Sequence, residues 1–156
     1  MPREIRRCSL LTGLALCAVL VGGVGVAQAS DNTLRLTLNS YSTKIVKDEN
    51  AVSNGLLVQY PKGHWKVLTR ALKHEVGDLQ ALTGKLKHQS ASSSRGRKAK
   101  ADIVKGLSLI AEAYGALRKD VLAVHGGAVP ASTVNAAIAT DKKGRKKLKT
   151  GLKLLG

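Results

Sequence analysis

The residues from about 98 to 124 carry a regular apolar repeat that constrains the fold more than any other feature of the chain. Seven apolar positions are separated alternately by four and three residues: Ile103, Leu107, Ile110, Tyr114, Leu117, Val121 and Val124. An α-helix places such positions on one face, whereas a strand alternates its faces at every residue. The repeat therefore predicts a helix with one side against an apolar core.

Three further segments have the same periodicity, at residues 33–54, 64–88 and 132–155. Proline, glycine and serine residues interrupt the pattern between them. The letters TLRLTL near residue 33 also alternate as a strand would, so the first helix is the least distinct of the four. With 156 residues the chain has the length of one domain. We expect an all-α fold, an antiparallel four-helix bundle joined by short connections.

The first 29 residues are predicted to be a cleavable secretory signal peptide. Three arginines precede an apolar run, and Ala27 and Ala29 occupy the small-residue positions of a cleavage site. Cleavage there would remove both cysteines and leave residues 30–156 as a single helical domain, secreted or held in the cell envelope. The alternative is that the apolar run is retained as a membrane anchor.

The predicted mature domain is strongly basic, with 23 Lys and Arg against nine Asp and Glu, a net charge of +14. Two dense clusters stand out, RGRKAK at residues 95–100 and KKGRKK at residues 142–147. Such runs are typical of surfaces that bind polyanions, but also of solvated faces that keep a domain soluble. The candidate polyanion-binding residues are Arg95, Arg97, Lys98, Lys100, Lys142, Lys143, Lys146, Lys147 and Lys149.

The last predicted helix separates its charges from its leucines. At 100° per residue its apolar side chains gather on one arc, and its six lysines fall on the opposite side. Asp141 lies on the apolar arc and Arg145 at its edge, four residues apart and in the favourable order for an ion pair on a helix. We therefore expect a folded helix here, with leucines inward and lysines outward, and not a loose basic tail.

The sequence offers little support for catalysis or for a bound cofactor. The four histidines lack the short spacings at which two imidazoles on one helix share a metal ion. No nucleophile elbow or phosphate-binding glycine loop is present, and the acidic residues are scattered. Tyr114 falls on an apolar stripe, which favours core packing with a hydrogen-bond partner for its hydroxyl. We expect no enzymatic activity, no metal and no cofactor.

These features predict an exported helical protein that binds anionic envelope polymers or anionic membrane surfaces through a basic face. Nucleic acid is not the favoured partner in vivo, because no aromatic side chains interleave with the basic clusters and export removes the protein from the chromosome. The alternative is a carrier of a small ligand such as a lipid or haem, with a pocket inside the bundle. That alternative depends on the many alanines and glycines of residues 98–155, which could leave room between helices or allow them to pack closely.

Overall fold

The computed structural model describes residues 29–156, and these residues form an all-α protein, as predicted. They contain four long helices and no strand: α1 (Ala29–Asn54), α2 (Trp65–His88), α3 (Ser94–Ala123) and α4 (Ala131–Leu155). Apart from Ala29, the predicted signal peptide lies outside the described residues.

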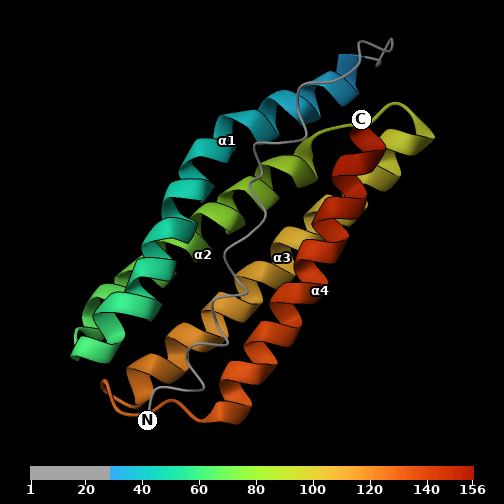
Figure 1. Cartoon of the computed structure of the whole chain (residues 1–156). Helices are drawn as coiled ribbons and strands as arrows, with labels where there is room; N and C mark the ends of the chain where they lie inside the picture. The colour runs from blue at the N-terminus through green and yellow to red at the C-terminus, as the bar shows by residue number, and fades with distance from the viewer. Residues whose placement is uncertain (1–28) are drawn as a thin grey trace.

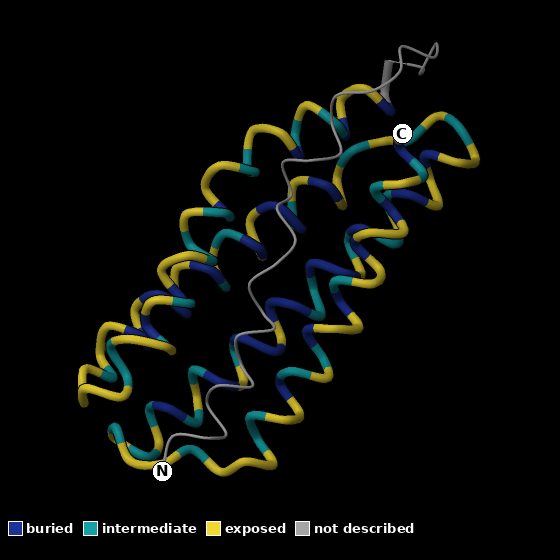
Figure 2. The backbone as a smooth tube through the Cα atoms, viewed as in Figure 1, coloured by how far each residue is buried: buried dark blue, intermediate teal, exposed yellow. Residues whose placement is uncertain are grey.

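Helices that follow one another in sequence lie side by side and run in alternating directions (Figure 1). The start of α1 and the end of α4 consequently lie at the same end of the molecule, where the Arg35 guanidinium donates a hydrogen bond to the carbonyl of Leu155. The buried positions of each helix face the other helices, and the exposed positions face outward (Figure 2). The core consists mainly of leucine, with alanine, isoleucine and valine, and the ring of Tyr114 is its largest member.

Side chains at the N-terminus of α3 explain why this helix begins at residue 94, four residues before the expected position. The Ser93 hydroxyl accepts a hydrogen bond from the Gly96 N–H at 2.7 Å, which caps the helix. The same hydroxyl donates to the carboxylate of Asp31 at 2.6 Å. Because Asp31 lies in the first turn of α1, this contact also ties the start of α1 to the start of α3.

The connection between α1 and α2 is helical for most of its length. After Asn54 the chain forms a π-helical turn, η3 (Gly55–Gln59), and then a 3₁₀ turn, η4 (Tyr60–Lys62). A Cβ on Gly55 would lie 3.0 Å from the Cα of Leu68, so a glycine here lets α1 and α2 approach closely. The direction reverses at Gly63, whose φ of +81° favours glycine.

Buried small residues are spaced seven apart on both α3 and α4. These residues are Ala99, Gly106 and Ala113 on α3, and Ala137, Gly144 and Gly151 on α4. A Cβ on Gly106 would lie 2.6 Å from the backbone nitrogen of Leu148, and one on Gly144 would lie 2.8 Å from the Gly106 carbonyl oxygen. The two backbones are therefore in direct contact, and at these positions the glycines bring the helices together and leave no cavity.

We predict opposite effects of the same substitution at two helical glycines. Gly106→Ala should lower the free energy of unfolding by about 1–3 kcal/mol, because the added methyl would overlap the α4 backbone. Gly77→Ala on α2 is the matched control, since nothing lies within 4 Å of its Cβ position. It should raise the free energy by up to about 1 kcal/mol through helix propensity. Urea unfolding of both variants measures this, and equal effects of the two substitutions would contradict the close contact of α3 and α4.

Candidate functional site

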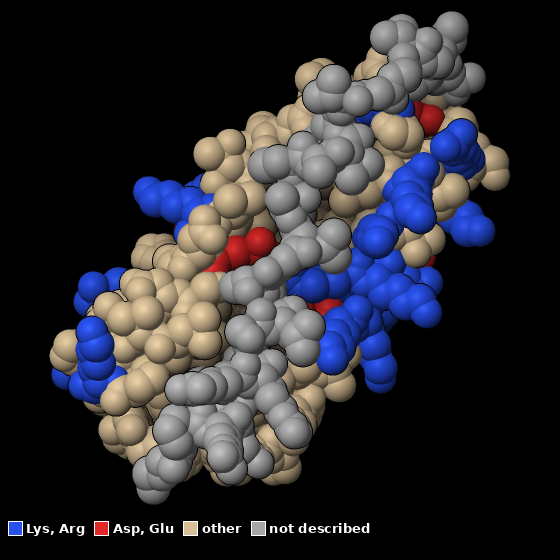
Figure 3. Space-filling view, viewed as in Figure 1, with Lys and Arg blue, Asp and Glu red and all other residues tan. Residues whose placement is uncertain are grey.

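The exposed side of α4 carries only positive charge. This helix contains seven basic residues and one acid, Asp141. All six of its lysines are exposed, whereas Asp141 is 1% exposed and faces the core. Figure 3 shows the blue side chains gathered over α4, on the right of the view. The expected separation of lysines and leucines on this helix is therefore present, because Leu148 and Leu155 are buried.

Arg145, the seventh basic residue of α4, turns inward and joins three helices. Its Nε donates to the Asp141 carboxylate at 2.9 Å, so the ion pair expected from the sequence is formed. Its Nη2 lies 3.0 Å from the Glu49 carboxylate of α1 and 3.1 Å from the Tyr114 hydroxyl of α3. The buried Tyr114 hydroxyl thus has a hydrogen-bond partner, as a tyrosine in an apolar core requires.

Helix α2 adds a fully buried carboxyl, Glu75, to this central region. Its exposure is 0%, and neither of its carboxyl oxygens has a hydrogen-bond partner among the described residues. Burial, together with the nearby negative charges of Glu49 and Asp48, raises the pKa of Glu75 to about 9, against the opposing charge of Arg145. Glu75 is therefore protonated at neutral pH. In this neutral form, burying a carboxyl group away from water has its lowest free-energy cost.

The other carboxyls of the cluster also have raised pKa values. Burial raises the pKa of Glu49 and of Asp141, and in both cases the charge and hydrogen bond of Arg145 act in the opposite direction. The four helices thus each place one or more polar side chains in this central region: Glu49, Glu75, Tyr114, and Asp141 with Arg145. Such a buried polar cluster is a means of fixing which helix faces meet.

The first of the two basic clusters, residues 95–100, lies beside the C-terminal end of α4. Arg95 Nη2 lies 3.4 Å from the carbonyl oxygen of Lys153, so this cluster contacts the C-terminal end of α4, beyond the second cluster at residues 142–147. The side chains of Arg95, Arg97 and Lys98 are exposed. Positive charge therefore continues from α4 onto the first turn of α3.

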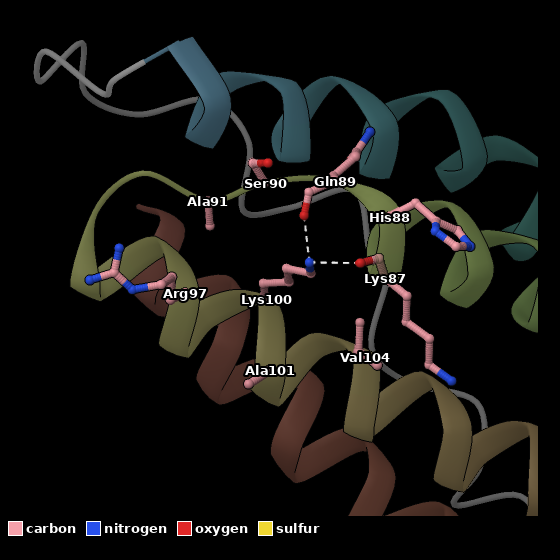
Figure 4. Close-up of a pocket in the computed structure, with 9 residues that line it drawn as sticks. All are labelled: Lys87, His88, Gln89, Ser90, Ala91, Arg97, Lys100, Ala101 and Val104. Atoms are coloured by element: carbon pink, nitrogen blue, oxygen red, sulfur yellow. Dashed lines mark hydrogen bonds between the residues drawn. The ribbon is translucent and has the colours of Figure 1, made fainter.

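Lys100 differs from the other candidate residues because its ammonium group is held by backbone carbonyls. It donates to the carbonyl of Lys87 at 2.9 Å and also to that of Gln89 (Figure 4). These carbonyls lie at the C-terminal end of α2, where a cation is favourable. Arg97 remains exposed, although its guanidinium also donates to the carbonyl of Ser92 at 2.8 Å. Lys100 thus joins the end of α2 to the start of α3.

A depression of about 710 Å³ lies around Lys100, between the end of α2 and the start of α3. Four of its nine lining residues are basic, and none is acidic: Lys87, His88, Arg97 and Lys100. In Figure 4 Lys100 lies across the centre of the depression, with Arg97 and Lys87 at its opposite ends. The depression is thus a basic extension of the surface formed by residues 95–100.

The charges of the molecule are sorted by exposure. Of the 23 Lys and Arg residues in the described part of the chain, 19 are exposed, whereas of its nine Asp and Glu residues only Glu112 is. Ion pairs partly neutralise two of the lysines, since Lys147 meets Asp102 at 3.0 Å and Lys44 meets Asp78 at 2.5 Å. Because the acidic side chains are less exposed than the basic ones, the outer surface presents mainly positive charge.

Sequence reasoning did not find Glu75, although the signal was present. Glu75 occupies the centre of a run in which Leu68, Leu72, Leu79, Leu82 and Leu86 are separated by the same four- and three-residue steps. A carboxyl at such a position is predicted to be buried by the same rule as its leucine neighbours. The four histidines, by contrast, are exposed, as their positions outside the apolar stripes indicate.

Comparisons with protein-family models, with curated proteins and with solved structures found no match to this chain. Within residues 29–156, no group of three or more His, Cys, Asp and Glu side chains could hold a metal ion. None of the described helices has a stretch long and apolar enough to cross a membrane.

We predict that the pKa of Glu75 makes the folded protein less stable as the pH rises. Between the usual pKa of 4.5 and the folded value of about 9, Glu75 is protonated in the folded chain and ionised in the unfolded chain. The folded state then binds the extra proton, so the contribution of Glu75 is fully present below pH 4.5 and is lost as the pH rises toward 9. Glu75→Gln should reduce the loss of unfolding free energy between pH 5 and pH 8 by more than about 1.4 kcal/mol, the value of one pKa unit.

Glu112→Gln is the matched control, because Glu112 is exposed on α3. Chemical unfolding at a series of pH values should give the same slope for this variant as for the unchanged protein. If Glu75→Gln also leaves the slope unchanged, Glu75 is ionised in the folded state and the buried position is wrong.

Proposed function

We propose that the chain is an exported, non-enzymatic binding protein that docks on anionic envelope polymers or anionic membrane surfaces through the exposed face of α4 and the first turn of α3. In this proposal the mature protein is an antiparallel four-helix bundle that begins at Ser30 after removal of a signal peptide. Ser30 is the second residue of α1, so cleavage before it would remove only Ala29 from that helix.

The observation that carries the proposal is the opposite placement of acids and bases. Eight of the nine acidic side chains of the described residues are buried or half-buried, and most basic side chains are exposed. Solubility alone is served by a surface of mixed charge. A surface with one sign of charge raises the local concentration of polyanions and speeds their association. The arrangement is therefore better suited to binding an anionic partner than to solvation alone.

Rigidity of α4 gives the basic face a second advantage. The lysines stand on a helix that is held from behind by its glycine contact with α3 and by the Arg145 cluster. Their backbone is already ordered before a partner arrives, so binding costs only the ordering of side chains. A disordered basic tail would lose backbone entropy in addition.

The small residues that suggested a ligand carrier favour close packing instead. Cβ atoms on Gly106 and Gly144 would overlap the backbone of the facing helix, and one on Gly151 would lie 2.7 Å from the Ala99 carbonyl oxygen. The proposal therefore rests on the outer surface of α4 and not on a pocket between α3 and α4.

We predict that replacing Lys142, Lys143, Lys146 and Lys147 by glutamine lowers the salt concentration at which the purified protein elutes from an anionic matrix. The four side chains are exposed on one helix, and phosphate- or carboxylate-type contacts weaken as salt competes.

The matched control replaces Lys47, Lys62, Arg70 and Lys73 by glutamine. These side chains are also exposed, and their loss changes the net charge by the same amount, but they lie on α1, η4 and α2. The control should elute close to the unchanged protein. Equal shifts for both variants would mean that retention follows net charge and that α4 is not the contact.

A further inference from the structure

Four of the lysines on α4 form a straight row along the helix. Lys142, Lys146, Lys149 and Lys153 follow one another at intervals of four, three and four residues. At 100° per residue they lie within an arc of about 60°. At a rise of 1.5 Å per residue the row is about 16 Å long, and the Cα atoms of neighbouring lysines in it are about 4.5–6 Å apart along the axis. All four residues are exposed, and none has an acidic partner within ion-pair distance among the described residues.

The two remaining lysines of α4 lie outside this row. Lys143 and Lys147 are rotated from it by roughly 60° or more on the helical wheel, and Lys147 is paired with Asp102 of α3. At the C-terminal end of α4, Arg95 extends the row, since its guanidinium meets the backbone carbonyl of Lys153 and its side chain is exposed. Four of the five lysines of α4 that lack an acidic partner among the described residues therefore lie in one line, with Lys143 to one side of it.

We propose that the partner of this surface is an extended acidic polysaccharide, with one carboxylate on each sugar, which lies lengthwise along α4 against Lys142, Lys146, Lys149 and Lys153. This inference rests on the proposed function and narrows it to one class of polymer. Each sugar in the footprint places one carboxylate near one ammonium group, and the long lysine side chains accommodate small differences in spacing.

A membrane surface fits this face less well than a polymer. A helix that binds lipid head groups inserts its apolar face into the bilayer, whereas Leu148 and Leu155 of α4 are buried within the protein. The large exposed apolar side chains of the described residues, Leu36, Leu57, Val58 and Val67, lie on α1, η3 and α2. The row on α4 therefore offers charge without an apolar anchor.

Nucleic acid also fits less well. Single strands are held by aromatic side chains that stack on the bases, and α4 contains no aromatic residue. A duplex carries one charge per about 1.7 Å along its axis on two winding strands, which a single straight row does not follow. A linear polymer with widely spaced charges matches the row better than either nucleic acid form.

The test measures binding of oligouronates of increasing length to the purified full chain at several salt concentrations. Affinity should rise with length until the sugar chain spans about 16 Å, the length of the row, and then level off. The row variant has Lys142, Lys146, Lys149 and Lys153 replaced by glutamine. Its slope of log affinity against log salt should fall by about 3, the value that four lost charge contacts give on a single-stranded polyanion such as single-stranded nucleic acid.

The off-row variant, with Lys98, Lys105, Lys143 and Lys147 replaced by glutamine, loses the same charge from the neighbouring surface of α3 and α4. Its salt slope should change by less than about 1 if these lysines make no direct contact. Circular dichroism and melting temperature, measured on both variants, establish that each is folded. An equal loss of slope in both variants would overturn the row as the binding site and leave the proposed function standing.

Two other results distinguish failure of the polysaccharide proposal alone from failure of the proposed function as well. Equal or tighter binding to vesicles of phosphatidylglycerol and phosphatidylcholine, lost in the row variant, would overturn the polysaccharide and identify the partner as a membrane. No binding of the unchanged protein to oligouronates, to vesicles or to an anionic matrix would overturn both this inference and the proposed function.

Discussion

Direct backbone contact between α3 and α4 determines the orientation on which the surface of the protein depends. Gly106, Gly144 and Gly151 let the two helices approach until no side chain fits between them at these points. Once the glycine side of α4 faces α3, the rotation of the helix is fixed, because the side-chain positions repeat every 3.6 residues. Leu148 then falls in the core. The lysines of α4 then lie on the exposed side of the helix.

The charged side chains of α4 are likewise divided between the core and the exposed surface. Arg145 is the one basic residue of α4 that turns inward, and it holds Asp141, Glu49 and the Tyr114 hydroxyl together. Burying these acids has two consequences. It places an ion pair and a hydrogen bond in the core that join α4 to α1 and α3, and it removes negative charge from the exposed surface. The neutral, protonated Glu75 extends this pattern to α2.

The sequence predicted the features that depend on local periodicity. The four helices, the inward leucines of α4, the pair of Asp141 with Arg145 and the burial of Tyr114 all follow from spacing along one helix. Glu75 was predictable by the same rule, from its place among leucines. The meeting of Arg95 with Lys153, the ties of Lys100 to Lys87 and Gln89, and the inward contacts of Arg145 with Glu49 were not predictable, because each joins residues from different helices. The glycines allowed either a cavity or close packing, and only the relative position of α3 and α4 distinguishes these.

The central claim is that α4 is a rigid helix whose lysines form a fixed outer face. Amide hydrogen exchange of residues 141–155 tests it most directly, since exchange reports the opening of each backbone hydrogen bond. Our account predicts slow exchange at Gly144, Leu148 and Gly151, comparable to that of the facing residues of α3, with faster exchange only at the last turn. Exchange at the rate of an unfolded chain throughout residues 141–155 would show a loose basic tail and contradict the account.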